Sequence, residues 1–372
     1  MKYFIIAGEA SGDLHASNLI KEIIKKDAHA QFRYLGGNLM EDVLKQPPII
    51  HYQQMAFMGI IDVVKNLPAI LKNLKTTKKS ILKFNPDVVI LIDYPGFNLK
   101  IADFAKSKGF KTVYYIAPKL WAWKEGRVKQ IKKNIDKLLV ILPFEIDFYK
   151  KHQIQAEYVG NPVVDAVQQH RAMRKDNFLN RFDLDKRPII ALLPGSRKQE
   201  IKMMLPDMLL ITEAFPEYQF VISGAPGFTK KDYEPYLKNK KIPVIFNHTY
   251  DLLQHAHSAI VTSGTAALET ALFKVPQIVV YKTQKWQYEI GKRIVKIAYF
   301  SLPNLIMQRE IIKELLQYDF NPDKLKTELL QINHGEKREK ILKDYRQLQQ
   351  ILGNKQASEK AADIIINLLN KA

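Results

Sequence analysis

The chain has 372 residues, with 57 Lys and Arg against 38 Asp and Glu, so its formal net charge is +19. Hydrophobic residues make up 47% and charged residues 26%, which excludes both a disordered chain and a polytopic membrane protein. The sequence contains no cysteine, and this excludes disulfides, iron–sulfur clusters and thiol nucleophiles. Such a charge suits three kinds of partner: nucleic acid, an anionic membrane surface or a phosphorylated substrate.

Short apolar runs alternate with amphipathic helical patterns along most of the chain. The amino-terminal run ends at Glu9, too soon for a signal peptide, and no later run approaches the ~18 residues of a spanning helix. Strands that alternate with helices are typical of parallel βα units. The predicted strands are 2–7, 87–92, 111–116, 137–142, 157–159, 188–193, 218–223, 243–246, 258–262 and 277–281.

A polar, basic stretch at 170–187 interrupts this alternation, and we interpret it as a domain boundary. The pattern predicts an α/β protein with two Rossmann-like domains, residues 1–168 and 186–345, each built on a parallel sheet. The chain beyond Asn321 looks helical, with predicted segments at 323–332, 336–352 and 358–369. Residues 346–372 are expected to pack back on the first domain or to exchange between the subunits of a dimer.

Ligands of open parallel sheets bind at the carboxyl ends of the strands, so the loops there are the candidate sites. The first loop, Gly8–Asp13, has two glycines for a tight turn and a helix start that favours an anion or a hydroxyl-rich ligand. Its spacing is not GxGxxG, which argues against a nicotinamide or flavin site. An ordinary βα turn is the alternative.

Asp93 ends the strongly apolar strand at 87–92 and precedes the turn formed by Pro95 and Gly96. A carboxylate at this position is suited to take a proton from a substrate hydroxyl. The alternative is that Asp93 caps the turn or the following helix, a role for which Asn98 is also suited.

Two loops of the second half have the composition of phosphate sites. Gly195–Arg197 places a guanidinium beside a helix start, which is typical of a diphosphate site. Ser263–Thr265 joins a strand to a helix through small hydroxyl residues, and Glu269 follows within that helix. Glu269 is suited to accept hydrogen bonds from ribose hydroxyls, and a solvated helix charge is the alternative.

The stretch 58–84 holds six lysines against one acid, with apolar residues at helical spacing. It predicts a basic amphipathic surface for an anionic bilayer, or else ordinary helices that bury an apolar face. Aromatic residues among basic ones, as around Trp121 and Trp286, would also suit single-stranded nucleic acid.

Several motifs together make the chain resemble the lipid-A-disaccharide synthases, enzymes of Gram-negative lipopolysaccharide biosynthesis. The matching segments follow the family's order from residue 8 to about residue 316. They are 8–13 (GEASGD), 93–98 (DYPGFN), 121–123 (WAW), 142–145 (LPFE), 160–165 (GNPVVD), 193–197 (LPGSR), 263–269 (SGTAALE) and 303–306 (PNLI). The chain departs from the family's usual pattern at Asn161 and Gly96, and neither position carries a group with an assigned role.

The resemblance implies a GT-B fold, in which two Rossmann-like domains face each other across a cleft, and an inverting transferase without metal or cofactor. The donor would be UDP-2,3-diacylglucosamine and the acceptor 2,3-diacylglucosamine 1-phosphate, known as lipid X. The products would be a β-1,6-linked disaccharide 1-phosphate and UDP. Other GT-B enzymes that act on UDP-N-acetylglucosamine, either a peptidoglycan-type transferase or an epimerase, are the alternative, and a basic nucleic-acid-binding protein is the alternative from another class.

With this resemblance, roles are expected for the residues of the strand-end loops. Asp93 would be the catalytic base, with His15 as second candidate, and the remaining residues would bind the substrates. Expected to bind the acceptor sugar are Glu9, Ser11, Gly12, Asp13, His15 and Asn98. Expected to bind UDP are Gly195, Ser196, Arg197, Ser263, Gly264, Thr265, Glu269 and Asn304.

The acylated substrates also imply a cytoplasmic enzyme that lies on the anionic inner face of the inner membrane and binds no nucleic acid. The expected membrane-facing residues are Lys65, Leu67, Ile70, Leu71, Lys72, Leu74 and Lys75.

Overall fold

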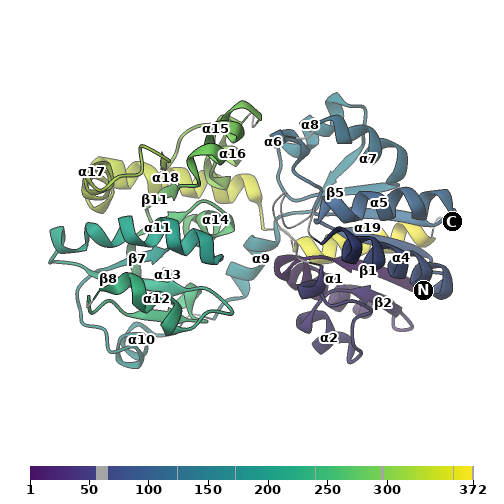
Figure 1. Cartoon of the computed structure of the whole chain (residues 1–372), viewed down its shortest axis with the longest axis horizontal. Coiled ribbons are helices and arrows are strands. Elements are labelled where there is room, and N and C mark those ends of the chain that lie inside the picture. Colours follow the sequence, from purple (N-terminus) through teal and green to yellow (C-terminus); the bar gives the residue numbers. More distant parts are fainter. Residues whose placement is uncertain are drawn as a thin grey trace. The chain divides into compact units, whose positions relative to one another are not determined.

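The computed structural model describes residues 1–55, 66–123, 125–171, 173–238, 240–294, 297–354 and 356–370. The chain forms two compact units, one of Met1–Pro162 with Lys355–Ala372 and the other of Val163–Asn354. Within the described residues each unit has a six-stranded, wholly parallel sheet between helices (Figure 1). This is the α/β architecture that the alternating pattern predicts.

The first sheet has the strand order β2-β1-β3-β4-β5-β6. Its strands are β1 (Lys2–Ala7), β2 (Gln31–Leu35), β3 (Val88–Ile92), β4 (Lys111–Tyr115), β5 (Lys137–Val140) and β6 (Ala156–Tyr158). The helices of this unit are α1 (Ala10–Lys26), α2 (Asn38–Leu44), α4 (Leu67–Phe84), α5 (Pro95–Ser107), α6 (Leu120–Trp123), α7 (Val128–Asn134), α8 (Glu145–Lys151) and α19 (Ala357–Asn370).

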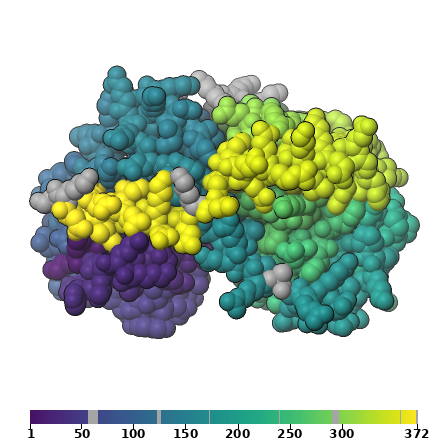
Figure 2. Space-filling view, turned by 180° about the vertical axis from the view of Figure 1, so that it is seen from behind, coloured from purple at the N-terminus to yellow at the C-terminus, as the bar shows by residue number. Residues whose placement is uncertain are grey.

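Both faces of this sheet are buried, because side chains alternate along each strand. In β1, Tyr3 and Ile5 belong to one apolar core, and Phe4 and Ile6 belong to the other. Helices α1 and α19 cover the first face, and α4, α5 and α7 cover the second. In Figure 2 the yellow α19 lies against the purple amino-terminal segment, although the two are far apart in sequence.

The second sheet has the order β12-β11-β10-β7-β8-β9. Its strands are β7 (Ile189–Leu193), β8 (Gln219–Gly224), β9 (Val244–Phe246), β10 (Ala256–Thr262), β11 (Gln277–Tyr281) and β12 (Lys313–Leu316). The helices are α9 (Pro162–Gln169), α10 (Lys175–Arg181), α11 (Lys198–Leu210), α12 (Lys230–Leu237), α13 (Thr249–His255), α14 (Thr265–Leu272), α15 (Lys285–Ile294), α16 (Leu302–Met307), α17 (Pro322–Asn333) and α18 (Gly335–Leu352).

The predicted strands are confirmed to within two residues at each end, and so are the three carboxyl-terminal helices. Two further strands, β2 and β12, were not predicted. Both lie at the edge of a sheet and carry charged residues, Arg33 in β2 and Lys313 and Glu314 in β12. Edge strands are commonly charged because this opposes pairing with another chain, and the charges interrupt the apolar run.

The chain passes from the first unit to the second after Pro162, and returns to the first at Lys355. The polar stretch interpreted as a domain boundary therefore lies in the second unit and includes α10. Among the described residues no helix is long and apolar enough to span a membrane.

Candidate functional site

The neighbouring strands β1, β3, β4 and β5 end at the same edge of the first sheet. The loop after each strand begins with the next residue of the chain: Gly8 after β1, Asp93 after β3, Ile116 after β4 and Ile141 after β5. The loops after β3 and β4 are joined directly, because the Asp93 N–H donates to the Tyr115 carbonyl at 3.4 Å. This edge is the candidate acceptor side of the site.

The backbone at Asp93 is held in an uncommon conformation. Asp93 and Tyr94 have φ angles of 44° and 47°, both in the left-handed region that residues other than glycine rarely adopt. The Asp93 carbonyl accepts hydrogen bonds from the Tyr114 hydroxyl at 2.6 Å and from the Asn98 side-chain amide at 2.8 Å. Backbone strain of this kind persists only where surrounding contacts impose it, and it is concentrated at functional sites.

The Asp93 side chain is half-buried, in contrast to its fully engaged carbonyl. Burial raises the pKa of this carboxyl, while the positive charge of Lys119 acts to lower it. A carboxylate with a raised pKa is a better proton acceptor than one in water, so the geometry suits general-base chemistry.

His15, the second candidate base, is half-buried in α1. Burial lowers the pKa of His15 to about 4, so the imidazole is neutral near pH 7. Its Nδ1 atom has no hydrogen-bond partner among the described residues. His15 is therefore an uncharged ring near the first loop that is able to donate or accept a hydrogen bond at Nδ1, and it stays the second candidate.

Two residues expected to touch the acceptor are buried supports of the loops. The Asp13 carboxylate accepts hydrogen bonds from the backbone N–H groups of Gly37 at 2.7 Å, Leu39 at 3.0 Å and Met40 at 3.3 Å, and so anchors the start of α2. Asn98 is fully buried and donates to the carbonyls of Ile92 and Asp93.

The other residues of the first loop differ in their burial, and Gly12 is buried. Glu9 is half-buried at the amino terminus of α1, Ser11 is exposed, and Gly12 packs close to Ala7. Glu9 and Ser11 therefore remain the side chains of this loop that are placed to meet a ligand.

Glu145 at the start of α8 is a buried carboxyl to which the sequence analysis gave no role. Its Oε1 accepts from the Trp121 indole at 3.0 Å and its Oε2 from the Leu142 backbone N–H at 3.0 Å. Burial raises the pKa of Glu145 to about 7, against the lowering effect of these hydrogen bonds and of Lys119. The rule that drew attention to Asp93, a carboxylate just after a buried strand, would also have identified it.

In the second unit, the strands β12, β11, β10 and β7 end at a common edge, and β10 pairs directly with β7. At the start of α11 the Glu200 carboxylate accepts from the backbone N–H groups of Ser196 at 2.8 Å and Arg197 at 3.2 Å. The Arg197 guanidinium also donates to Glu200, at 2.9 Å. The groups expected to bind a diphosphate are thus already paired with an anion of the protein itself.

Gly195 makes this arrangement possible. Its φ of 109° is rarely adopted by other residues, and an added Cβ would lie 2.5 Å from the Cβ of Glu200. Only glycine allows the loop to come this close to the Glu200 side chain.

The loop after β10 contributes the other expected nucleotide-binding residues. Gly264 and Thr265 are exposed at the start of α14, and the Ser263 hydroxyl donates to the Phe300 carbonyl at 3.0 Å. Glu269 accepts a hydrogen bond from the Tyr250 hydroxyl at 2.9 Å, and burial raises the pKa of this carboxyl. Tyr250, which the sequence did not single out, therefore fixes one oxygen of Glu269.

Asn304 is fully buried, and its amide is used within the unit. It donates to the Ile312 carbonyl and to Glu314, and accepts from the backbone N–H groups of Ile311 and Ile312. Glu314 also accepts from the backbone of Phe300 and Ser301. Asn304, expected to bind UDP, therefore holds the start of α16 in place.

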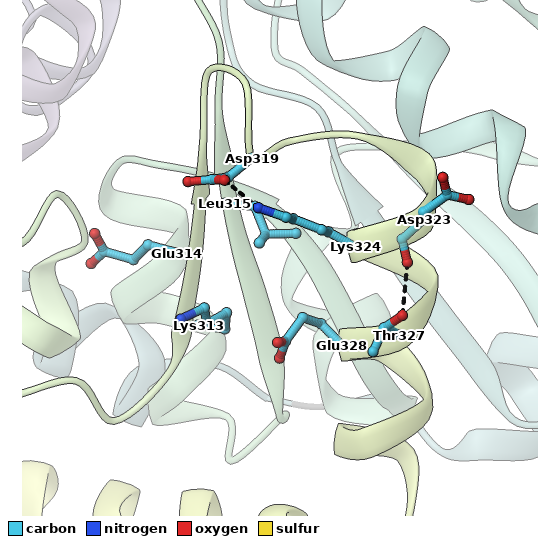
Figure 3. Close-up of a pocket in the computed structure, with 8 residues that line it drawn as sticks. All are labelled: Lys313, Glu314, Leu315, Asp319, Asp323, Lys324, Thr327 and Glu328. Atoms are coloured by element: carbon cyan, nitrogen blue, oxygen red, sulfur yellow. Dashed lines mark hydrogen bonds and ion pairs between the residues drawn. The ribbon is translucent and has the colours of Figure 1, made fainter.

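A surface pocket beside the edge strand β12 contains none of the predicted site residues (Figure 3). It is lined by Lys313, Glu314, Leu315, Asp319, Asp323, Lys324, Thr327 and Glu328. Lys324 pairs with Asp319, and Glu314 points away from Lys324 toward the start of α16. We assign no role to this pocket.

The predicted membrane surface is partly corrected by the burial of α4. Leu67 and Leu71 are 47% and 54% exposed, whereas Leu74 is only 7% exposed and belongs to the apolar core. Ile70 packs against the same core. The helical period places Leu74 on the inner face of α4 with Thr77 and Ile81, so this part of the prediction was wrong. Lys72 and Lys75 are exposed, and Lys65 lies outside the described residues.

Among the described residues, no group of three or more histidine, aspartate or glutamate side chains is arranged to hold a metal ion.

Comparison with known proteins gives a consistent family assignment. The model of the family described as lipid-A-disaccharide synthetase matches residues 3–367. A lipid-A-disaccharide synthase of Geobacter metallireducens is 34% identical over 100% of this chain and 98% of its own length. The enzyme of the same name from Coxiella burnetii is 33% identical, with 98% of each chain covered.

Solved structures of low sequence identity share the fold. A UDP-GlcNAc 2-epimerase of Methanocaldococcus jannaschii, in complex with UDP-GlcNAc and UDP, is 18% identical with a TM-score of 0.65, and covers 100% of both chains. The calicheamicin glycosyltransferase CalG4 is 14% identical with a TM-score of 0.62, and covers 100% of this chain and 98% of its own.

Proposed function

Because the chain belongs to the lipid-A-disaccharide synthase family and is thus a glycosyltransferase of GT-B fold that forms the lipid A disaccharide, we propose the individual steps of its reaction. The enzyme transfers 2,3-diacylglucosamine from UDP to the 6-hydroxyl of 2,3-diacylglucosamine 1-phosphate, with inversion at the anomeric carbon. Asp93 takes the proton from the acceptor hydroxyl as it attacks from the face opposite the departing UDP.

The observation that carries this assignment is the arrangement of Asp93. Its carbonyl is fixed by Tyr114 and Asn98, and its carboxylate is left half-buried at the edge where four strands end. A fixed backbone with an available carboxylate supports a positioned base, because a proton acceptor must stay within hydrogen-bond reach of the hydroxyl.

The second unit is proposed to bind UDP. Arg197 and the start of α14 at Thr265 would stabilise the negative charge that develops on the diphosphate, as preorganised donors do elsewhere. Glu269, oriented by Tyr250, would accept hydrogen bonds from the ribose hydroxyls.

Mass spectrometry of the product tests this proposal. Purified protein is incubated with UDP-2,3-diacylglucosamine and lipid X, and we expect a tetraacyl disaccharide 1-phosphate and UDP. Parallel reactions with UDP-N-acetylglucosamine separate this activity from an epimerase or a peptidoglycan-type transferase. Product from the N-acetylated donor alone would overturn the proposal.

The substrates are lipids, and we propose that α4 docks on an anionic membrane surface. Exposed Leu67 and Leu71 supply an apolar contact, and exposed Lys72 and Lys75 supply attraction to acidic headgroups, roughly 1 kcal/mol for each lysine near the surface. Lys72→Glu with Lys75→Glu should weaken flotation with phosphatidylglycerol vesicles. Equal changes at Lys340 and Lys343 of α18 are the control, and unchanged flotation of the α4 variant would contradict the docking.

A further inference from the structure

The loop after β4 is held as tightly as the Asp93 turn, and it carries one lysine that the proposed reaction does not use. Ile116 has a φ of 62°, an uncommon value for a β-branched residue, so this loop departs sharply from the strand. Lys119 is exposed, and its ammonium has no hydrogen-bond or ion-pair partner among the described residues. An exposed cation on a constrained loop is well placed to meet an anion.

Buried contacts fix the loop on both sides of Lys119. On one side, the Tyr149 hydroxyl donates to the Pro118 carbonyl at 3.1 Å. On the other, the Trp121 indole donates to the buried Glu145 carboxylate at 3.0 Å and packs edge-on against Phe144, with ring centres 5.0 Å apart. Both contacts come from the segment after β5, the next strand of the sheet.

Lys119 also lies close enough to Asp93 for their charges to interact. The strands β3 and β4 are neighbours, and the backbones of Asp93 and Tyr115 are hydrogen-bonded at the point where they end. The Lys119 charge acts on the carboxyls of both Asp93 and Glu145.

We infer that Lys119 is the cation of an anion-binding subsite beside Asp93. The ligand of this subsite is the phosphate monoester of the acceptor, and Glu145 is the residue that positions Lys119. The inference rests on the proposed function, because it takes Asp93 as the base. An ammonium carried on a constrained loop beside the base would bind the phosphate end of the sugar while Asp93 engages the hydroxyl, and so orient the acceptor between two points.

Steady-state kinetics with two acceptors test the subsite. Lipid X is compared with the same 2,3-diacylglucosamine lacking the 1-phosphate, and the ratio of their kcat/KM values is measured. In Lys119→Gln we expect this ratio to fall by roughly tenfold or more, as for the loss of one charge-assisted hydrogen bond, mainly through the KM of lipid X. Lys129→Gln, an exposed lysine of α7, is the matched control. An unchanged ratio, with both acceptors slowed equally, would overturn the phosphate contact.

Trp121→Phe tests positioning, because it removes the indole donor and keeps an aromatic ring. We expect a smaller fall in the same ratio. An unchanged ratio would show that Glu145 does not act through Trp121. Circular dichroism and the melting temperature identify variants that fail to fold, and Glu145→Gln provides a second change at the same contact.

Two further measurements distinguish a failure of the subsite from a failure of the proposed reaction and from binding of lipid headgroups. The affinity for lipid X in the absence of donor is measured by calorimetry in detergent, and it should be lower in Lys119→Gln than in wild type. This result is expected even if the protein forms no disaccharide, so it tests the subsite independently of the proposed reaction. Flotation with anionic vesicles should be the same for Lys119→Gln and wild type. Weaker flotation with unchanged lipid X binding would mean that Lys119 meets lipid headgroups, and would overturn the inference.

Discussion

The carboxyl edges of the two sheets are built in opposite ways. At the first edge, hydrogen bonds converge on the carbonyl of Asp93 and leave its carboxylate available. At the second edge, the donors expected to bind a diphosphate, at Ser196 and Arg197, are paired with the Glu200 carboxylate. The proposed acceptor side is therefore arranged for reaction in advance, whereas part of the proposed donor side is paired with an internal anion.

This difference separates the expected effects of mutation. Changes at Asp93 should act on turnover, because a fixed base contributes in the transition state. Changes at Glu200 should act on donor affinity, because its carboxylate competes with the proposed diphosphate for Ser196 and Arg197.

The largest effect is expected for Asp93→Asn, which keeps the size of the side chain and removes the base. Turnover should fall by at least ~10²-fold with little change in the KM of the donor, as is usual for loss of a general base. Initial rates at saturating substrates measure it. Asp103→Asn, an exposed aspartate of α5, is the control, and near wild-type turnover of Asp93→Asn would exclude this carboxylate as the base.

The buried Glu145 carboxyl at the first edge should make the free energy of unfolding depend on pH. Its pKa is raised to about 7 in the folded protein from 4.5. Between these values the folded state holds a proton that the unfolded state has lost, so stability falls as pH rises through this window. A shift of this size corresponds to roughly 3 kcal/mol. Urea midpoints at pH 5 and pH 7.5 should differ less in Glu145→Gln than in wild type, and equal differences would contradict the raised pKa.

Glycines at the two edges should respond differently to alanine. Gly195→Ala places a methyl group against Glu200 at a φ of 109° and should cost about 1–3 kcal/mol of stability. Gly96→Ala, where an added Cβ meets nothing within 4 Å, should be close to neutral. Thermal unfolding of the two variants measures the contrast, and equal melting temperatures would show that the approach of Glu200 to Gly195 is not constrained.

The smallest effect is expected for Glu200→Gln. Loss of the negative charge weakens the internal competitor for Arg197 and the helix start, so UDP should bind several-fold more tightly, in keeping with about 1 kcal/mol for a partly exposed ion pair. Calorimetric titration with UDP measures it. Weaker binding would mean that Glu200 supports the donor site in its present position.

Much of the fold was predictable because buried parallel strands give apolar runs that turn residues interrupt. Strands such as β1 and β11 were predicted at their observed limits. The edge strands β2 and β12 were not, because charged residues interrupt their apolar runs, Arg33 in β2 and Lys313 and Glu314 in β12. The exposed face of α4 was predicted in part, since the period groups Leu74 with Thr77 and Ile81 but does not say which face of the helix enters the core.

Sequence reasoning located the loops of the candidate site but not the partners of their side chains. Asp13 and Asn98 look like ligand-binding residues because they are polar and follow strands, yet their hydrogen bonds go to backbone groups brought close by folding. The Tyr250 hydroxyl donates to Glu269, which lies 19 residues later in the sequence, and no local sequence pattern indicates this contact. The Glu200 contact had half of a signal, because Glu200 occupies the glutamate position of a capping box, whereas Arg197 stands where that motif has Ser or Thr.

The return of the chain to the first unit has a consequence for the order of folding during synthesis. Helix α19 buries Ala361, Ala362 and Ile365 against the face of the sheet that α1 also covers, and it is made after the whole of the second unit. The second unit is therefore complete in sequence before α19 is made, whereas the first, although begun earlier, keeps part of one sheet face uncovered until α19 is available. The half of the protein that carries Asp93 is the half that is finished last.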